Sequence, residues 1–425
     1  MWAVDLVPSQ QPDRQSTMPQ SPPDPPQSCR RDAWKFLEPT VLVACTLVFT
    51  LFVIGIGVLL LTGNNPSGRD VVSFWVAGRQ IVHHADPYDS AAILQIERAS
   101  GFPLQSQALI MRNPPSALCL VVPLGLFSLR AGALLWSLLL LAAFALAVHM
   151  LWRMLGHPSN KLHYLGYSFA PALLCILGGQ TALFALLGLV LFLRFHRDRP
   201  FVAGLALWLC ALKPHLFLPF AAALLLWIVL HRALRLLAGA LLALAASSLF
   251  ASLLDPQVWT QYAQMMRSSG IQNEFIPCLA VALRYALHRQ AMALQFLPAA
   301  AACLWAIYFF YKRRAHWDWM QDGALLMLVS ILAGPYSWIT DQALLVPALL
   351  LGAYRATRAQ IALLALASAV IEITPLTGKG LHSPIYLWTT PFWLAWFLYV
   401  SAGSAPSSPS LVAAGSNNCR CAAKQ

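Results

Sequence analysis

Long apolar runs alternate with short polar segments along almost the whole chain. A membrane-spanning helix needs about 20 apolar residues, and the run 41–61 reaches that length without a charge. Further apolar runs occupy 131–151, 164–177, 181–193, 201–212, 216–230, 236–254 and 292–311, with shorter pairs around 334–341 and 374–383. The pattern therefore predicts an all-α polytopic membrane protein.

The segment 114–127 interrupts this regularity. Its apolar part is short and contains Pro123, and a proline inside a helix removes a hydrogen bond and breaks or kinks it. We therefore expect a re-entrant segment, which leaves about twelve crossings. If 114–127 crossed the membrane, every later segment would have the opposite orientation.

The composition is far from that of a soluble domain. Of the 425 residues, 59% are hydrophobic and 10% are charged, against roughly 25% charged in an average soluble domain. The net charge of +12 does not indicate nucleic-acid binding, because the basic residues follow apolar runs rather than forming a patch on a soluble module. Their positions instead orient the spans. We expect a multi-pass protein of the bacterial inner membrane with both termini in the cytoplasm.

The two ends of the chain differ from its centre. Residues 1–35 are rich in Pro, Gln and Ser and lack the apolar stretch of a signal peptide, so we expect a disordered cytoplasmic segment. A transmembrane domain should cover 36–403, with its first extracytoplasmic loop at 63–113. Residues 404–425 are rich in Gly, Ser and Pro, which predicts a disordered tail.

The sequence offers no recognisable cofactor or metal motif. Most of the nine cysteines lie inside apolar runs, without CxxC pairs, so we expect buried thiols. Cys419 and Cys421 in the tail are either lipidated or free. There is no Walker loop, dinucleotide fingerprint, HExxH or GxSxG sequence. We expect no cofactor, no metal site, and a substrate that already resides in the membrane.

The first polar loop carries the most structured pattern. Apolar residues recur at helical spacing from Val71 to Val82, which predicts a helix lying on a surface, with Arg79 on its polar side. Asp70 stands where that helix begins and is either a cap or a catalytic base. Asp86 and Asp89 are typical of a turn followed by a new helix cap.

Several polar residues stand beside apolar runs. Lys213, followed by Pro214, must pair, reach the interface or bind an anion. Gln180 either turns the chain after two glycines or belongs to a site. Asp341 is an intramembrane partner for a cation or a site acid. His215 fits a supporting hydrogen-bonding role, and Trp338, like Trp75, is either an interface-belt residue or a sugar-stacking platform. With about twelve crossings, one face collects Asp70, Arg112, Gln180, Lys213, His215, Asp341 and Lys379.

Taken in order, these motifs resemble a known family. Asp70, the WVAGR run at 75–79, DPYD at 86–89, NPP at 113–115, GQ, KP and PYSWITDQALLVP at 335–347 are similar to glycosyltransferase family 87. The resemblance covers about 70–347. Phe74 and Trp75 stand where the family often has two tyrosines, and Ile339 and Thr340 replace a polar pair; these departures concern the sugar and the acceptor rather than the fold.

The resemblance implies a GT-C architecture and a polyprenyl-phosphate-mannose-dependent mannosyltransferase. The partners would be a polyprenyl-phosphate sugar donor, a lipid or glycan acceptor and membrane lipids, with no nucleic acid. It implies that Asp70 is the general base of an inverting transfer. We expect the donor phosphate or the substrates to be bound by Arg112, Lys213, His215, Gln180, Asp341, Trp338 and Tyr88.

Two other functions fit parts of the same pattern. Intramembrane charges and broken helices also occur in transporters or flippases of lipid-linked sugars, although the sequence contains no evident inverted repeat. A glycan ligase or polymerase would need a larger second extracytoplasmic loop than the stretch 255–290.

Overall fold

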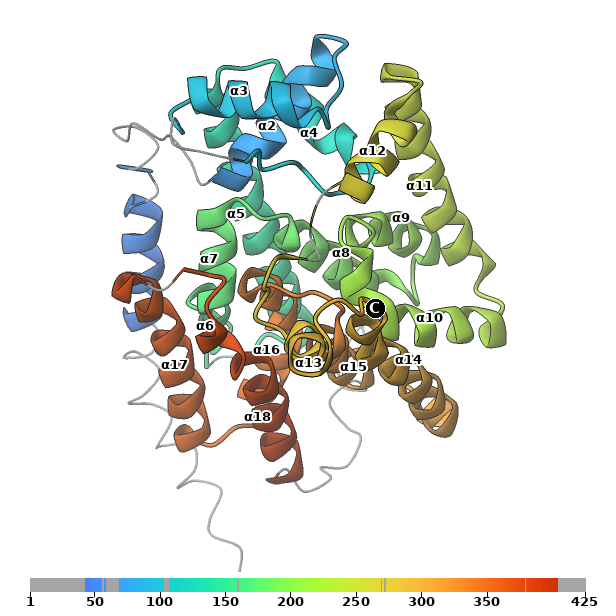
Figure 1. Cartoon of the computed structure of the whole chain (residues 1–425). Coiled ribbons are helices and arrows are strands. Elements are labelled where there is room, and N and C mark those ends of the chain that lie inside the picture. The colour runs from blue at the N-terminus through green and yellow to red at the C-terminus, as the bar shows by residue number, and fades with distance from the viewer. Residues whose placement is uncertain are drawn as a thin grey trace, which may run out of the picture.

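The computed structural model describes residues 43–55, 57–58, 69–102, 107–158, 160–268, 270, 273–378 and 380–403. Within these ranges the regular structure is helical, which confirms the prediction of an all-α protein (Figure 1). The segments 1–35 and 404–425, Lys379, Cys419 and Cys421 lie outside the described residues.

Four helices are long and apolar enough to cross a membrane: Leu129–Met154, Pro214–His231, Leu234–Leu254 and Ala293–His316. The other expected spans fall on shorter helices, beginning with Val43–Gly55. The chain is therefore an integral membrane protein. The helices of its body are α5 (Leu129–Met154), α6 (Tyr164–Tyr167), α7 (Ala170–Gly178), α8 (Ala182–Phe195), α9 (Pro200–Cys210), η2 (Pro214–Phe217), α10 (Leu218–His231), α11 (Leu234–Leu254), α13 (Leu279–Leu287), α14 (Ala293–Arg313), η4 (Arg314–His316), α15 (Asp322–Ala333), η5 (Ile339–Leu345), α16 (Val346–Ala353), α17 (Arg358–Ile373), η6 (Thr374–Thr377), η7 (Pro384–Tyr386) and α18 (Thr389–Gly403).

A smaller group of helices covers one end of this body (Figure 1). It contains α2 (Arg69–Val82), α3 (Ser90–Ala99), η1 (Pro115–Ala117), α4 (Leu118–Gly125) and α12 (Val258–Ser268), and we call it the cap. Asp89 caps α3 by accepting from the amides of Ala91 and Ala92 at 2.9 and 3.3 Å. Asp86 accepts from the Tyr88 amide at 2.8 Å. These two carboxylates are turn and capping groups, as the sequence indicated.

The helix α2 differs from the expected surface helix in its burial. All of the residues 71–78 are buried, and only its last turn is exposed, at Arg79. At Gly78 the backbones of α2 and α4 touch, since a Cβ there would lie 2.1 Å from the Val121 carbonyl oxygen. Ser73, Val76 and Ala77, which lie away from the apolar stripe, are buried as well, so neighbouring helices cover this side of α2 too.

The segment 114–127 forms η1 and α4 in the cap, and α5 begins directly after it, capped by Ser128. The two pieces make one short apolar helix, Pro115–Gly125. The expected polar loop 255–290 contains α12 in the cap and α13 in the body, where α13 packs against α14. The stretch 255–290 therefore contains two helices instead of forming a simple loop.

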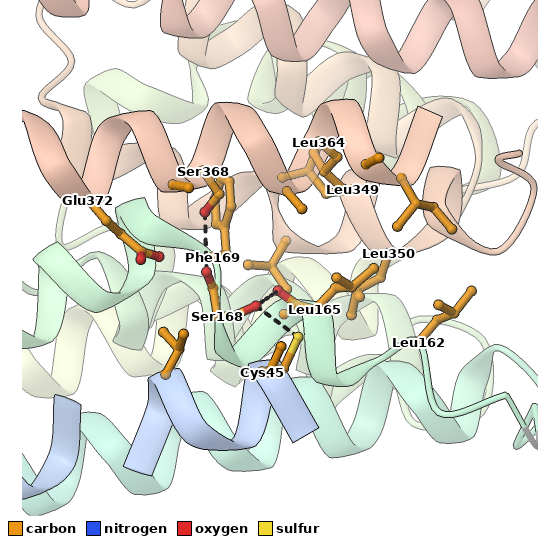
Figure 2. A pocket seen from close by; sticks show the side chains of 18 of the residues that line it. Cys45, Leu162, Leu165, Ser168, Phe169, Leu349, Leu350, Leu364, Ser368 and Glu372 are labelled. Atoms are coloured by element: carbon orange, nitrogen blue, oxygen red, sulfur yellow. Dashed lines mark hydrogen bonds between the residues drawn. The ribbon is translucent and has the colours of Figure 1, made fainter. Parts of the chain in front are cut away.

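An apolar groove with a volume of about 400 Å³ lies between the first helix, α6 with the residues that follow it, α16 and α17. Figure 2 shows Cys45 and Ser168 next to each other in its lining, where the Ser168 hydroxyl lies 3.2 Å from the Cys45 sulfur and donates to it. Arg358 and Glu372 belong to its lining. None of the predicted site residues lines this groove, so it is separate from the polar site described next.

Candidate functional site

The start of α2 rests directly on the end of α7. Gly179 ends α7 with a φ of 76°, and a Cβ there would lie 2.0 Å from a methyl carbon of Val71. The Gly179 carbonyl accepts from the Trp136 indole at 2.7 Å. Because glycine alone permits both the backbone conformation and the close approach, the Gly178–Gly179 pair brings Asp70 next to Gln180.

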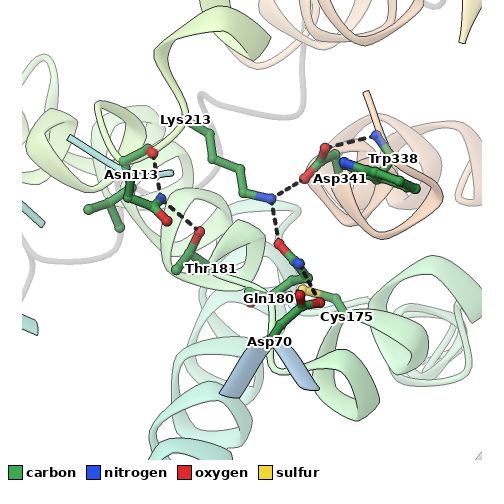
Figure 3. Close-up of polar contacts among 9 residues, drawn as sticks. Asp70, Asn113, Cys175, Gln180, Thr181, Lys213, Trp338 and Asp341 are labelled. Carbon is green, nitrogen blue, oxygen red and sulfur yellow. Dashed lines mark hydrogen bonds and ion pairs between the residues drawn. The ribbon is translucent and has the colours of Figure 1, made fainter. Parts of the chain in front are cut away.

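Gln180 links an acidic and a basic side chain through its amide (Figure 3). Its Nε2 donates to Asp70 Oδ2 at 2.6 Å, and its Oε1 accepts from Lys213 Nζ at 2.8 Å. A lysine ammonium can only donate, so the amide oxygen must face it and the amide nitrogen must face the carboxylate. This orientation makes Asp70 a hydrogen-bond acceptor.

Lys213 and Asp341 form a buried ion pair. Lys213 Nζ lies 2.5 Å from Asp341 Oδ1, and the side chains are 10% and 1% exposed. The second Asp341 oxygen accepts from the Trp338 backbone amide at 2.9 Å. Removing one member of a buried pair typically costs about 3–5 kcal/mol, because the other charge is left uncompensated. The pair therefore ties the Leu212–Pro214 connection firmly to η5.

Asn113 fixes the backbone beside Lys213. Its Nδ2 donates to the Leu212 carbonyl at 2.8 Å and lies 3.5 Å from the Thr181 hydroxyl. Asn113 therefore links Leu212, which precedes Lys213, to Thr181, which follows Gln180 (Figure 3). Asn113 was part of the NPP motif but was not predicted as a site residue. A polar residue directly before two prolines was the only sequence signal.

Arg112, the residue before Asn113, forms a second ion pair. Its guanidinium makes two parallel hydrogen bonds to Glu274, at 2.6 and 3.1 Å. The two side chains are 32% and 33% exposed. The Arg112 carbonyl also accepts from the Tyr262 hydroxyl at 3.4 Å. Exposed pairs of this kind contribute about 0–1 kcal/mol, so this pair opens far more easily than the pair of Lys213 and Asp341.

Aromatic side chains line the same region. The His215 ring stacks on Tyr336 with their centroids 3.9 Å apart, and Trp338 meets His382 edge-on at 4.7 Å. Tyr88 is buried, and its ring lies 5.5 Å from the ring of Tyr262. Burial raises the pKa of both of these tyrosines, so they are neutral at physiological pH.

The structure joins four predicted residues, Asp70, Gln180, Lys213 and Asp341, in one hydrogen-bonded network. Trp338 contributes its backbone amide to that network, while Arg112, His215 and Tyr88 lie in other contacts. Trp75, weighed as an interface or sugar-stacking residue, is instead 6% exposed and donates to the Phe127 carbonyl. Within the described ranges, no three His, Cys, Asp or Glu side chains form a group that could hold a metal ion.

Besides Asn113, the residues Glu274 and Gln342 of this region were not predicted. Glu274 looked like an ordinary charged residue of a polar loop, and no pattern in the sequence pointed to it. Gln342 follows Asp341 but faces away from the network, where its amide accepts from the Trp393 indole and donates to Thr389, both at 2.7 Å. Gln342 therefore fastens η5 to the body while Asp341 faces Lys213.

Fold and site together define a helical integral membrane protein with a buried network of charged and amide groups at the junctions of its short helices. The sequence profile of glycosyltransferase family 87 matches residues 112–335, which is more than half of the chain. The chain belongs to this family and is a membrane glycosyltransferase. The matched range contains Arg112, Gln180 and Lys213, whereas Asp70 and Asp341 lie outside it. No curated protein and no solved structure matches the chain.

Proposed function

We propose that the protein transfers a hexosyl residue, specifically mannosyl, from a polyprenyl-phosphate sugar to a lipid or glycan acceptor, with inversion. The observation that carries this proposal is the network of Asp70, Gln180, Lys213 and Asp341 in a family 87 glycosyltransferase. A donor that is itself a lipid needs no nucleotide-binding domain.

Asp70 is the general base in this proposal. The acceptor hydroxyl oxygen bonds to the anomeric carbon of the sugar while its proton passes to the Asp70 carboxylate. The bond between that carbon and the phosphate oxygen breaks, and its electron pair stays on the phosphate. The products are the glycosylated acceptor and the polyprenyl phosphate. The amide of Gln180, which donates to Asp70 at 2.6 Å, supports the ionised form that a base needs.

The departing phosphate gains negative charge, and the cations of the site, Lys213 and Arg112, are suited to stabilise it. In this proposal the two side chains stabilise the phosphate charge directly, and no metal ion is assigned to that role. Lys213 is held in place by Gln180 and Asp341, so its charge is oriented before the reaction starts. Fixed charges of this kind stabilise a transition state without reorganising during the reaction.

We place this reaction on the extracytoplasmic face of a bacterial inner membrane, with both termini in the cytoplasm. Asp70 stands at the start of α2 in the cap and is joined through Gln180 to Lys213 in the body. A lipid donor would reach this face from the adjoining leaflet.

The test compares Asp70→Asn with wild type in membranes supplied with labelled polyprenyl-phosphate mannose and cell-envelope lipids. Loss of a general base should lower the rate about 10²- to 10⁴-fold. The matched control is Asp89→Asn, because asparagine also caps helices well and Asp89 lies away from the network. The control should keep wild-type activity.

Wild-type-like transfer by Asp70→Asn would refute the role of Asp70. The same membranes, prepared as sealed vesicles, distinguish a transferase from a flippase. Movement of the lipid-linked sugar across the bilayer without a new glycosidic bond would refute the transferase function and favour a transporter.

A further inference from the structure

The two cations that the proposed function assigns to the donor phosphate, Lys213 and Arg112, already hold a carboxylate. Lys213 is paired with Asp341, and Arg112 is paired with Glu274. This inference rests on the proposed function, in which the donor phosphate interacts with at least one of these two cations. A phosphate added beside the carboxylate would place two anions on one cation, and like charges at that distance repel. The favourable arrangement is therefore the one in which the phosphate replaces the carboxylate, so that one of the two pairs opens.

The pair of Lys213 and Asp341 is the harder one to open. Asp341 is 1% exposed, and its other oxygen is held by the Trp338 amide. Lys213 is additionally held by Gln180. Separating these two charges would leave a buried ion without compensation, which is the costly case.

The pair of Arg112 and Glu274 has the opposite properties. About a third of each side chain is exposed, so both charges can be hydrated when they separate. The guanidinium holds the two carboxylate oxygens at 2.6 and 3.1 Å. This two-pronged geometry is also the one in which arginine binds phosphate.

Glu274 can leave Arg112 without dismantling the surrounding structure. The next residues, Phe275 and Ile276, pack into a small apolar cluster with Tyr336 and Trp338. That cluster anchors the backbone at the start of the segment that leads to α13. Rotation of the Glu274 side chain alone is therefore enough to vacate the guanidinium.

We propose that the lipid donor's phosphate binds in the fork of Arg112, in the place that Glu274 occupies, and that Glu274 competes with it. Arg112 is then the residue in direct contact with the phosphate. Lys213 stays in its network and acts on the reaction from there. Glu274 sets how tightly the donor is held, because every donor must displace it.

The test measures the binding of decaprenyl phosphate to the full-length purified protein by native mass spectrometry, beside the KM for the lipid-linked sugar. Glu274→Gln removes the competing charge but keeps the size and polarity of the side chain. It should bind decaprenyl phosphate about two- to fivefold more tightly, the range expected for removing an exposed pair, and lower KM by a similar factor. Asp255→Asn is the matched control, because Asp255 accepts from the Gln257 amide in the same connection, and it should behave as wild type.

Arg112→Gln should bind decaprenyl phosphate at least about tenfold more weakly, because hydrogen bonds to a charged group are lost. A purely structural role of the ion pair predicts instead that Glu274→Gln binds no better than wild type. That result, or wild-type affinity in Arg112→Gln, would overturn the proposal. Binding of decaprenyl phosphate is measured without turnover, so it is independent of sugar transfer. A protein that bound the lipid phosphate through Arg112 but transferred no sugar would refute the proposed function and would leave the phosphate site in place.

Discussion

At the scale of single residues, Gln180 connects the site because its two amide ends differ. Lys213 can only donate and therefore fixes the amide oxygen, which leaves the amide nitrogen for Asp70. Glutamate at this position would place two carboxylates side by side, and leucine would leave Lys213 and Asp70 without this link. The network therefore depends on the amide itself and not only on its polarity.

The coupling between Lys213 and Asp341 can be measured directly. Lys213→Met and Asp341→Leu should each lower the free energy of unfolding by about 3–5 kcal/mol, because each leaves a buried charge unpaired. The double variant should be less destabilised than the sum of the two single changes. Urea or thermal unfolding in detergent checks this, and strictly additive losses would show that the two charges do not stabilise each other.

The sequence revealed those residues whose surroundings are unusual for their chemistry. Lys213 and Asp341 stand out because a charge beside an apolar run needs a partner, and each proved to be the other's partner. Glu274 carried no such signal, because carboxylates are ordinary in polar loops. The contact of Asp70 with Gln180 spans 110 residues, and no local pattern encodes such a distance.

At the scale of helices, the sequence predicted where apolar segments lie better than how they pack. The helix at 69–82 was expected from its spacing, but its burial on every side was not. Periodicity detects large apolar residues, whereas Ser73 and Ala77, away from the apolar stripe, are small and buried rather than exposed. Gly78, on the stripe itself, permits the close approach of α4, and a hydropathy pattern does not show what covers the other side of the helix.

Gly78→Ala should be destabilising because the new methyl group would meet the backbone of α4. A Cβ at Gly78 would lie 2.1 Å from the Val121 carbonyl oxygen, and backbone cannot rotate away as a side chain can. We expect a loss of at least about 1–3 kcal/mol, the usual cost of overpacking, measured as unfolding in detergent.

The matched control is Gly55→Ala in the first helix, where a Cβ would have nothing within 4 Å. Alanine is favoured over glycine in a helix by roughly 0.5–1 kcal/mol, so this variant should be neutral or slightly more stable. Equal stability of Gly78→Ala and wild type would mean that α2 and α4 are less closely packed than described.

At the scale of the whole molecule, the orientation of the cap depends on the segment 114–127. Its helices are short and belong to the cap, while α5 is 26 residues long, or about 39 Å at 1.5 Å per residue. That length exceeds the roughly 30 Å hydrocarbon core of a bilayer. If 114–127 is re-entrant, the cap and the end of α5 lie on opposite sides of the membrane.

Cysteine labelling tests this arrangement. Single cysteines at Ser90→Cys in the cap and Arg153→Cys at the end of α5, both at exposed positions, would be placed in a chain without its native cysteines. A membrane-impermeant maleimide should label the first in intact spheroplasts and the second only after permeabilisation. Labelling of both from the same side would show that 114–127 crosses the membrane.

The network also restricts insertions and deletions in the connections between its helices. The connections at 179–181, 211–213 and 334–338 join successive helices, and they carry or adjoin Gln180, Lys213 and Asp341. One residue inserted before Lys213 would turn the helix behind it by about 100° or shift it by about 1.5 Å. Connections are usually where insertions are tolerated. In this protein we expect natural length variation to avoid these three and to collect in connections away from the network, such as 155–163.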